Sequence, residues 1–244
     1  MAKRLHQFLR AVRLQRDEVE DFGRYPFNIP AVRTLDELEF APGITFFIGE
    51  NGSGKSTLME AIAIAMGLNA EGGSQNFSVA ARPSESELHR YLVPVRGVGR
   101  PRARFFLRAE TLFNIATEVE ERGLQAYGWQ ILHERSHGEA FLWLLNERFK
   151  AQGLYLLDEP EAALSPKRQL AALARLHALV QRGAQFIIAT HSPILMAYPG
   201  ATIYQLDEEG MQVVTFEDTE HFQITRDFLA RPESFLKHLL NPDP

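Results

Sequence analysis

The stretch from Gly49 to Ser56 (GENGSGKS) limits the folds open to this chain more than any other feature. It matches the pattern G-x-x-x-x-G-K-[ST], follows the apolar run Ile44–Ile48 and precedes the apolar, proline-free run Ser56–Met66, which Gly67 ends. This order predicts a buried strand, a glycine-rich loop and a helix. Backbone N–H groups of such a loop turn toward phosphate oxygens, and the helix adds its positive end. The sequence therefore predicts a site for a phosphate-bearing ligand.

The side chains of this loop indicate a nucleotide bound with Mg²⁺. Lys55 is expected to reach the β- and γ-phosphates, where it also serves catalysis, and the Ser56 hydroxyl is expected to bind the metal. An ordinary glycine turn is the alternative, but a chance match in a chain of this size is on the order of one in a hundred. The predicted nucleotide-binding residues are Gly49, Glu50, Asn51, Gly52, Ser53, Gly54, Lys55, Ser56 and Thr57.

Two adjacent carboxylates follow a second apolar run. Leu154–Leu157 is of the kind that lies inside a parallel sheet, and Asp158 and Glu159 come directly after it. Asp158 is expected to hold Mg²⁺, directly or through water. Adjacent strand residues point to opposite sides, so Glu159 can aim elsewhere and act as general base on the attacking water. The alternative is a strand that ends in solvated acids, and it is less favoured because the same chain contains the glycine loop.

Two shorter features point to the same chemistry. Ser136-His137-Gly138-Glu139 precedes the apolar run Ala140–Phe149, which places a hydroxyl and backbone N–H groups at another helix N-terminus. A plain N-cap is the alternative there. His191 ends the strand-like run Phe186–Thr190; we expect it to contact a γ-phosphate and help orient the water, whereas hydrogen-bonded packing is the alternative.

These motifs, in this order, resemble those of ABC-type ATPases. Ser136–Glu139 resembles a variant of the family signature leucine-serine-glycine-glycine-glutamine and lies 22 residues before Asp158, while His191 lies 33 residues after it, where the family carries its switch histidine. Arg135, His137 and Glu139 depart from that signature. The motifs around Asp158 and His191 are similar to those of stand-alone ATPases related to chromosome-maintenance (SMC), RecF-type and overcoming-lysogenization-defect proteins.

The resemblance implies a cofactor, a partner and a fold. It implies ATP with Mg²⁺, and a homodimer that closes head to tail so that Ser136 and Gly138 of one copy face the γ-phosphate on the other. The expected fold class is α/β: a P-loop NTPase of ABC-ATPase type in a single domain. We expect a β-rich N-terminal lobe (about 1–48), a core with a parallel sheet (about 44–68 and 150–216), a small helical and loop lobe (about 69–149) and C-terminal helices (about 218–240).

Some roles stay open between several residues. Gln75 and Glu110 are alternatives for the glutamine that this family places near the metal. Tyr25, Phe27 and Arg13 are alternatives for the side chain that covers the adenine, although an aromatic residue in this lobe is more often part of the core. Within Asn69–Pro101, seven glycines and prolines predict loops and short helices.

Charge and composition bear on the partners. The net charge of −5 provides no global positive field, yet Arg82–Arg108 holds seven arginines against two glutamates. That segment is a candidate for binding a nucleic-acid backbone, and pairing with the chain's own carboxylates is the alternative. Three alternatives remain for the process that ATP binding and hydrolysis would drive: a nucleic-acid or defence process, transport as a transporter subunit, or switching of a protein partner. No apolar run approaches the roughly 20 residues of a membrane span, and with no cysteine we expect a cytoplasmic protein.

Overall fold

The computed structural model of the protein describes residues 7–69, 73–74, 86–108 and 136–240. Its centre is a seven-stranded sheet in the order β10-β9-β3-β8-β7-β6-β4. Strands β6, β7, β8, β3 and β9 run parallel, and only β4 and β10 at the edges are antiparallel to their neighbours. The strands are β3 (Ile44–Ile48), β4 (Gly73–Ser74), β6 (Ala103–Arg108), β7 (Gly153–Asp158), β8 (Gln185–Ala189), β9 (Thr202–Asp207) and β10 (Gly210–Val214). The predicted α/β class with a parallel core sheet is confirmed.

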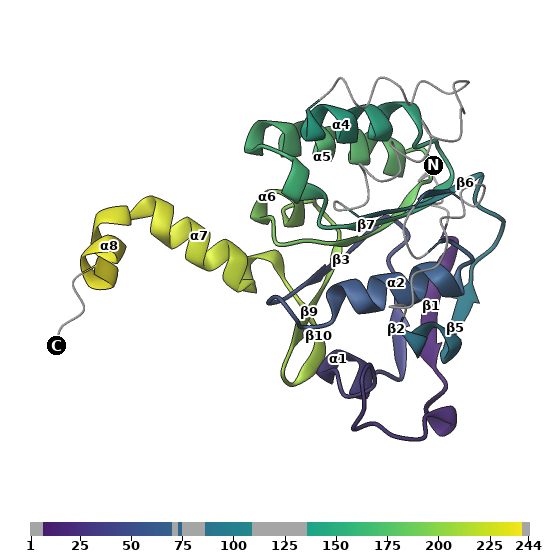
Figure 1. Ribbon diagram of the computed structural model, residues 1–244. Helices are drawn as coiled ribbons and strands as arrows, with labels where there is room; N and C mark the ends of the chain where they lie inside the picture. The colour runs from purple at the N-terminus through teal and green to yellow at the C-terminus, as the bar shows by residue number, and fades with distance from the viewer. Residues whose placement is uncertain (1–6, 70–72, 75–85, 109–135, 241–244) are drawn as a thin grey trace.

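Both faces of this sheet are covered, which explains why its central strands are buried throughout and mostly apolar. Helices α4 (His137–Glu147), α5 (Pro166–Val180) and α6 (Pro193–Met196) pack on one face, and α2 (Lys55–Ala65) lies on the other (Figure 1). Successive residues of β3 alternate between the two cores, so that Phe46 packs on the α4 side and Phe47 on the α2 side. The strand is thereby held from both sides directly before the glycine loop.

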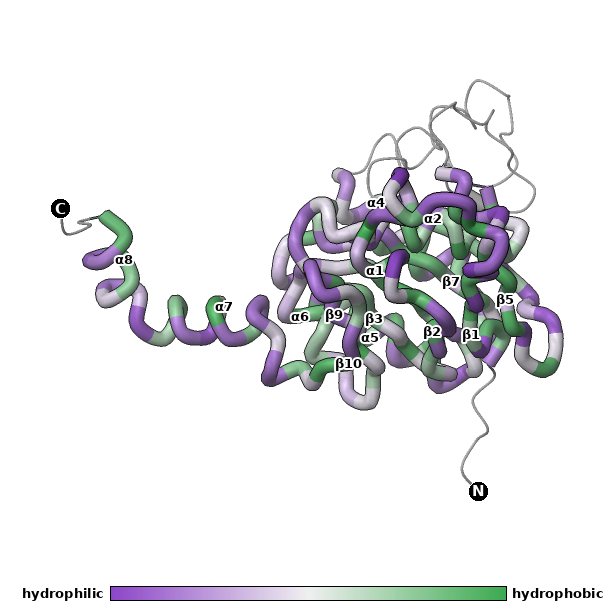
Figure 2. Tube along the Cα trace, turned by 90° about the horizontal axis from the view of Figure 1, so that it is seen from below, coloured by the Kyte–Doolittle hydropathy of each residue, from purple (hydrophilic) through white to green (hydrophobic). Residues whose placement is uncertain are grey.

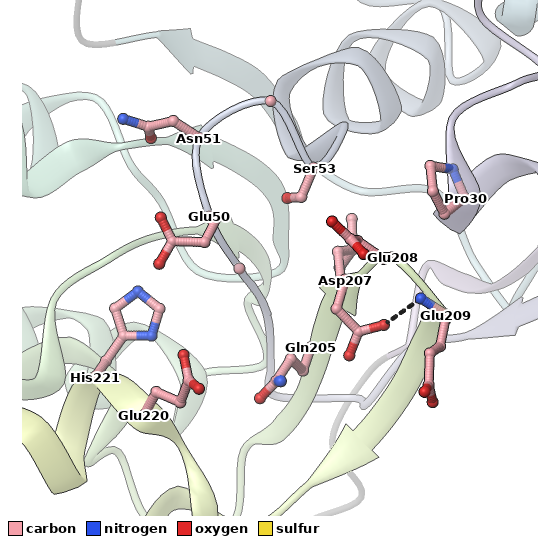
Figure 3. A pocket seen from close by; sticks show the side chains of 13 residues that line it. Pro30, Glu50, Asn51, Ser53, Gln205, Asp207, Glu208, Glu209, Glu220 and His221 are labelled. Atoms are coloured by element: carbon pink, nitrogen blue, oxygen red, sulfur yellow. Dashed lines mark hydrogen bonds between the residues drawn. The ribbon is translucent and has the colours of Figure 1, made fainter.

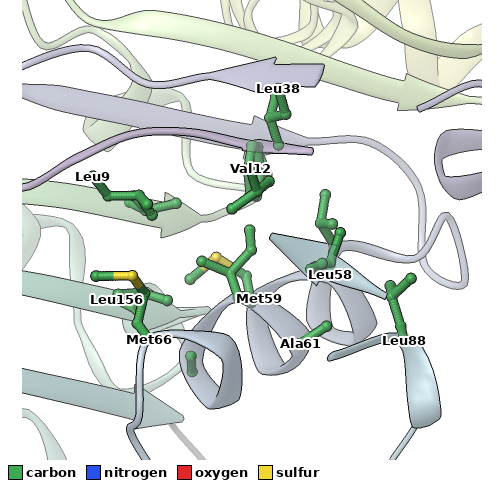
Figure 4. Packing of buried hydrophobic residues seen from close by; sticks show 14 of the residues in the cluster. Leu9, Val12, Leu38, Leu58, Met59, Ala61, Met66, Leu88 and Leu156 are labelled. Carbon is green, nitrogen blue, oxygen red and sulfur yellow. The ribbon is translucent and has the colours of Figure 1, made fainter. Parts of the chain in front are cut away.

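A smaller antiparallel sheet completes the core on the α2 side. It has the order β2-β1-β5, formed by β2 (Glu37–Glu39), β1 (Leu9–Leu14) and β5 (Leu92–Arg96). Figure 4 shows Leu9, Val12 and Leu38 of this sheet facing Leu58 and Met59 of α2 across the buried cluster.

Strand β5 corrects one expectation, because the glycine- and proline-rich region was predicted to hold only loops and short helices. Pro94 lies inside this strand opposite Val12. Proline cannot donate to a sheet ladder, but β5 is an edge strand with a partner on one side only, where proline is tolerated. The short 3₁₀ turn η2 (Glu87–Arg90) just before it agrees with the expectation.

Gln185 at the start of β8 joins the two sheets. Its Oε1 accepts from the N–H groups of Phe8 at 2.8 Å and Leu9 at 3.0 Å, and its Nε2 donates to the carbonyls of Leu9 at 2.7 Å and Ala41 at 2.9 Å. The side chain is fully buried. One amide thus satisfies four backbone groups that would otherwise be left inside the core.

The remaining elements agree closely with their predicted positions. Helix α2 is followed by Gly67 at φ 76°, and the hairpin β9–β10 turns over Glu208 and Glu209. The other short elements are η1 (Arg16–Glu18), α1 (Pro30–Arg33), η5 (Pro160–Ala163) and η6 (Phe216–Asp218).

The chain ends in two helices that extend away from the sheets (Figures 1 and 2). They are α7 (Glu220–Ala230) and α8 (Pro232–Leu240), which begins at a proline. No residue of either helix is buried. Over the described part of the chain, the structure contains no helix that combines the length and the apolar character of a membrane span.

Candidate nucleotide site

The glycine loop connects the carboxyl end of β3 to the first turn of α2. At Gly49 the backbone φ is 140°, and a Cβ would lie 2.2 Å from the carbonyl oxygen of Leu206. At Gly54 the φ is 95°, and a Cβ would lie 2.5 Å from Cγ2 of Ile29. Both positions therefore require glycine, because other residues would combine a strained backbone with a clash. The neighbouring β9 and the segment before α1 fix the path of the loop.

Lys55 lies inside this loop, with its ammonium group folded back onto the chain. Its Nζ donates to the carbonyl oxygens of Gly49 at 2.8 Å and Glu50 at 2.9 Å. The residue is only 4% exposed. Burial lowers the pKa of Lys55, while the nearby carboxylates of Glu159 and Asp158 act in the opposite direction. The loop thus encloses a positive charge near its own backbone N–H groups, as an anion site requires.

Ser56 and Asp158, which are far apart in sequence, meet at the end of the sheet. The Ser56 hydroxyl donates to Oδ1 of Asp158 at 3.2 Å. Arg108, at the end of the adjacent strand β6, has its Nε 3.6 Å from Oδ2 of the same carboxyl group and its Nη2 2.9 Å from Glu60. Burial raises the pKa of Asp158 to about 6, although Arg108 and the Ser56 hydroxyl oppose the shift.

The donor set at this point fits Mg²⁺. The hydroxyl and the carboxylate are hard oxygen ligands, and Mg²⁺ in nucleotide sites commonly takes only one or two protein ligands, with water and phosphate oxygens supplying the rest. In the described ranges no three His, Cys, Asp or Glu side chains gather into a metal cage. The residues present therefore suit a metal that arrives with a phosphate ligand.

Glu159 and His191 lie beside this pair. Glu159 has φ 51° in the left-handed region and precedes η5, and its carboxyl group is 42% exposed. The Nε2 atom of His191 lies 3.7 Å from Oε1 of Glu159, and the His191 backbone N–H donates to Oε1 of Glu161 at 2.5 Å. A backbone turned out of the strand direction is what lets Glu159 point away from Asp158.

Three buried polar atoms near this site have no hydrogen-bond partner among the described residues: Oγ of Ser53, Nε2 of His191 and Oε2 of Glu161. Buried polar groups are almost always satisfied, so these atoms call for an explanation. A bound phosphate group, which accepts hydrogen bonds through several oxygens, would provide a partner for the Ser53 hydroxyl and for a protonated Nε2 of His191, whereas the Glu161 oxygen requires a donor. This observation favours an anionic ligand between the loop and His191.

A cavity of about 610 Å³ opens on the outer side of the loop. Figure 3 shows Glu50, Asn51 and Ser53 of the loop, the acids of the β9–β10 hairpin and His221 of α7 around it. It is lined by Pro30, Gly49, Glu50, Asn51, Gly52, Ser53, Gln205, Leu206, Asp207, Glu208, Glu209, Glu220 and His221. Sequence reasoning missed His221, because no motif spacing connects the C-terminal helices to the loop.

Ser136 and Gly138 do not line this cavity. Ser136 is exposed directly before α4, and Arg168 of α5 donates to its hydroxyl at 3.2 Å and to Oε1 of Glu139 at 2.9 Å, whereas Gly138 in the first turn is buried. A Cβ at Gly138 would lie 2.6 Å from the carbonyl oxygen of Ala163. Glycine is therefore required for close contact with η5, and the helix N-terminus faces outward.

The three candidates for the side chain that covers the adenine differ in burial and in contacts. Phe27 is fully buried and packs edge-on against Tyr91, with ring centroids 4.9 Å apart. Tyr25 is 60% exposed, and its hydroxyl lies 3.3 Å from that of Thr57 on α2. Arg13 pairs with Glu37 at 3.0 Å in the smaller sheet. Gln75 and Glu110 lie outside the described residues.

The arginine-rich segment divides into two groups. Arg108 belongs to the buried network with Glu60 and Asp158 described above. Burial, and then the positive charges of Arg96 and Arg100, lower the pKa of Arg104, so three guanidinium groups lie close to one another. Arg96, Arg100 and Arg102 are exposed. Arg82 lies outside the described residues.

Comparison with known proteins identifies two segments of the chain. A sequence model described as an AAA domain matches residues 19–123, which include the glycine loop. A second, described as an AAA domain, putative AbiEii toxin, Type IV TA system, matches residues 139–197, which include Asp158, Glu159 and His191. No curated protein matches the sequence.

Solved structures show a distant likeness. The SMC head domain from Thermotoga maritima is 18% identical with a TM-score of 0.43, over 85% of this chain and 98% of that one. A putative metal-chelate type ABC transporter is 19% identical with a TM-score of 0.44, over 75% and 76%. A bacterial Atm1-family ABC exporter with ATP bound is 15% identical with a TM-score of 0.44, over 91% and 43%.

The strand order, the loop geometry and the two matched segments agree with one another. The glycine loop lies in one matched segment, and the strand-end acids and His191 lie in the other. The chain has a P-loop NTPase-like α/β fold, and two of its segments match models of AAA domains.

Proposed function

We propose that this protein binds MgATP in the glycine loop and hydrolyses it to ADP and phosphate. The hydrogen bond of 3.2 Å between Ser56 and Asp158 carries the proposal, because it brings the hydroxyl of the loop to the acid of β7 beside Lys55. A chance glycine turn would have no reason to meet a buried carboxylate. The cytoplasmic location expected from the composition is part of this proposal.

Each side chain has a distinct role in the reaction. The loop N–H groups and Lys55 bind the phosphates, and Ser56 with Asp158 would hold Mg²⁺, whose charge neutralises phosphate oxygens. Glu159, partly exposed and turned away from Asp158, accepts a hydrogen bond from the attacking water and polarises it as general base. His191 directs its unsatisfied Nε2 toward the phosphate that is transferred.

A second copy of the chain completes the site in this proposal. Ser136 is exposed at the N-terminus of α4, and Gly138 lies in the first turn of the same helix. Such a terminus stabilises an anion, so a head-to-tail pair would place it on the γ-phosphate of the partner. Hydrolysis removes the phosphate that both copies contact, and the pair opens.

The test measures binding and turnover separately. Glu159→Gln is expected to bind a fluorescent ATP analogue as the wild type does but to release phosphate about 10²- to 10⁴-fold more slowly, the usual contribution of a general base. Lys55→Ala should lose binding, whereas Lys150→Ala, which removes an exposed ammonium elsewhere, should retain both activities. Wild-type turnover by Glu159→Gln would exclude the role given to that residue.

A second proposal concerns the partner of the ATPase. The arginines around Arg104 favour a nucleic-acid backbone as that partner. Burial lowers the pKa of Arg104, and the positive charges of Arg96 and Arg100 add to this shift, so both of these like charges lie near Arg104. Phosphates would neutralise them with release of counterions, which makes binding steeply dependent on salt.

The experiment titrates a labelled DNA duplex at several salt concentrations. The double reversal Arg100→Glu and Arg102→Glu should weaken binding and reduce its salt dependence. The matched double reversal Arg182→Glu and Arg231→Glu makes the same change in net charge at exposed sites elsewhere and should have a smaller effect. Equal effects of the two variants would contradict a specific surface and favour a transporter subunit or a protein switch.

A further inference from the structure

His221, in the first turn of α7, contacts the histidine of the nucleotide site. Its Nε2 lies 3.2 Å from Nδ1 of His191, with the ring centroids 5.4 Å apart and the rings inclined by 49°. The same side chain lines the cavity at the glycine loop, where it lies beside Glu50 and Glu220 (Figure 3). The C-terminal segment thus reaches the site through one imidazole ring.

The position of His221 is fixed by the start of α7. Thr219 is fully buried, donates from its hydroxyl to the carbonyl of Phe216 at 2.8 Å and accepts from the N–H of Phe222 at 3.3 Å. The rings of Phe216 and Phe222 are 4.5 Å apart on either side of this cap. The first turn is therefore anchored to the core, although the rest of α7 is exposed.

The hydrogen bond between the two rings decides where the proton of His191 lies. In a neutral imidazole one nitrogen donates and the other accepts, and the bond made by one nitrogen sets the role of the other. If His221 donates from Nε2, then Nδ1 of His191 accepts and Nε2 of His191 carries the proton. That Nε2 has no hydrogen-bond partner among the described residues and lies 3.7 Å from Oε1 of Glu159, and only its protonated form can donate to a phosphate oxygen.

We propose that His221 is a positioning residue for the nucleotide site, which holds the His191 ring in the tautomer and orientation that donate from Nε2 to phosphate. The inference rests on the proposed binding of MgATP beside His191. His221 does not touch the reacting atoms in this arrangement and acts through His191. Because His221 belongs to α7, a displacement of this helix would also release the ring of His191.

The surroundings of His221 favour the neutral form of its ring. Burial, followed by the nearby His191, lowers the pKa of His221, while Glu50 and Glu220 act against the shift and Lys55 adds to it. A neutral His221 at pH 7 has one N–H to give and one nitrogen to accept with. The proposal itself stands on the 3.2 Å contact and on the unsatisfied Nε2.

The first experiment observes the tautomer in the protein without nucleotide. The chain has eight histidines, and ¹⁵N-histidine NMR spectra of the wild type, His191→Gln and His221→Gln assign the two rings. The wild type should show a protonated Nε2 and an unprotonated Nδ1 on His191. His221→Ala should give a mixture of tautomers, and His221→Gln, whose amide can still donate, should keep the wild-type pattern. A proton on Nδ1 in the wild type, or an unchanged His191 in His221→Ala, would overturn the proposal.

The second experiment separates kcat from KM for ATP. His221→Ala is expected to lower kcat about 10- to 100-fold, the usual loss when the orienting partner of a functional histidine is removed, with a smaller change in KM, and His221→Gln should recover most of the rate. His238→Ala, on exposed α8, is the matched control and should behave as the wild type. Equal kcat for His221→Ala and wild type would also overturn the proposal.

Failure of the proposed function and failure of the positioning role of His221 can be distinguished. If the wild type neither binds nor hydrolyses ATP, the proposed function fails. The tautomer of His191 in the nucleotide-free protein still decides whether His221 positions this ring.

Discussion

Replacing Asp158 by asparagine is expected to stabilise the metal-free protein while it removes the carboxylate that would hold Mg²⁺. The carboxyl group is 7% exposed, and burial raises its pKa from 3.8 to about 6. Each pKa unit corresponds to about 1.4 kcal/mol, so keeping this group ionised costs the folded state about 3 kcal/mol. A neutral amide avoids that cost, and its oxygen can still accept from the Ser56 hydroxyl.

The sign of the pH dependence follows from the same shift. The unfolded chain loses this proton near pH 3.8 and the folded protein near pH 6, so the stability of the wild type falls as the pH rises between these values and is then constant. The advantage of Asp158→Asn should therefore be about 3 kcal/mol at pH 7.5 and roughly half as large at pH 5.

Urea unfolding in the presence of EDTA at both pH values measures these differences. Asp36→Asn is the matched control, since that side chain is 82% exposed and its replacement should change the free energy of unfolding by less than about 0.5 kcal/mol. The reasoning is refuted if Asp158→Asn is less stable than the wild type at pH 7.5, or if its advantage does not shrink toward pH 5.

Two further predictions concern packing. Gln185→Leu should destabilise the protein by about 3–5 kcal/mol in urea unfolding, because it leaves four buried backbone groups without their partner; exposed Gln212→Leu is the control, and equal stability of the two variants would contradict the role of Gln185. Gly49→Ala should destabilise the protein by at least about 2 kcal/mol more than Gly52→Ala in the same assay. Both alanines are strained by a positive φ, but only the Cβ at position 49 would clash, at 2.2 Å from the carbonyl oxygen of Leu206. Equal destabilisation by the two variants would contradict this reasoning, because it would show that the Leu206 carbonyl can move aside.

The sequence predicted those parts of the fold and the site that depend on local patterns. The glycine loop, the wholly apolar strands β7 and β8 and the helix after the loop are each encoded within a few neighbouring residues, and all lie where they were expected. Edge strand β5 was missed because Pro94 argues against a strand unless the position within the sheet is known.

Contacts between distant residues carried no local signal. Gln185 meets Leu9 across 176 residues, and His221 meets His191 across 30. A glutamine before a strand and a histidine at the start of an exposed helix are ordinary features of a surface. Only the fold shows that the first is buried and that the second faces the glycine loop.

The solution mass of Glu159→Gln with and without MgATP tests the central claim, that two copies share the nucleotide. Slow hydrolysis in this variant should hold the closed pair, so the account predicts a monomer without nucleotide and a dimer with it. Adding Lys55→Ala or Ser136→Arg to the same variant should abolish the dimer, the first by loss of binding and the second by loss of the partner's contact. A variant that binds ATP and stays monomeric would contradict the account.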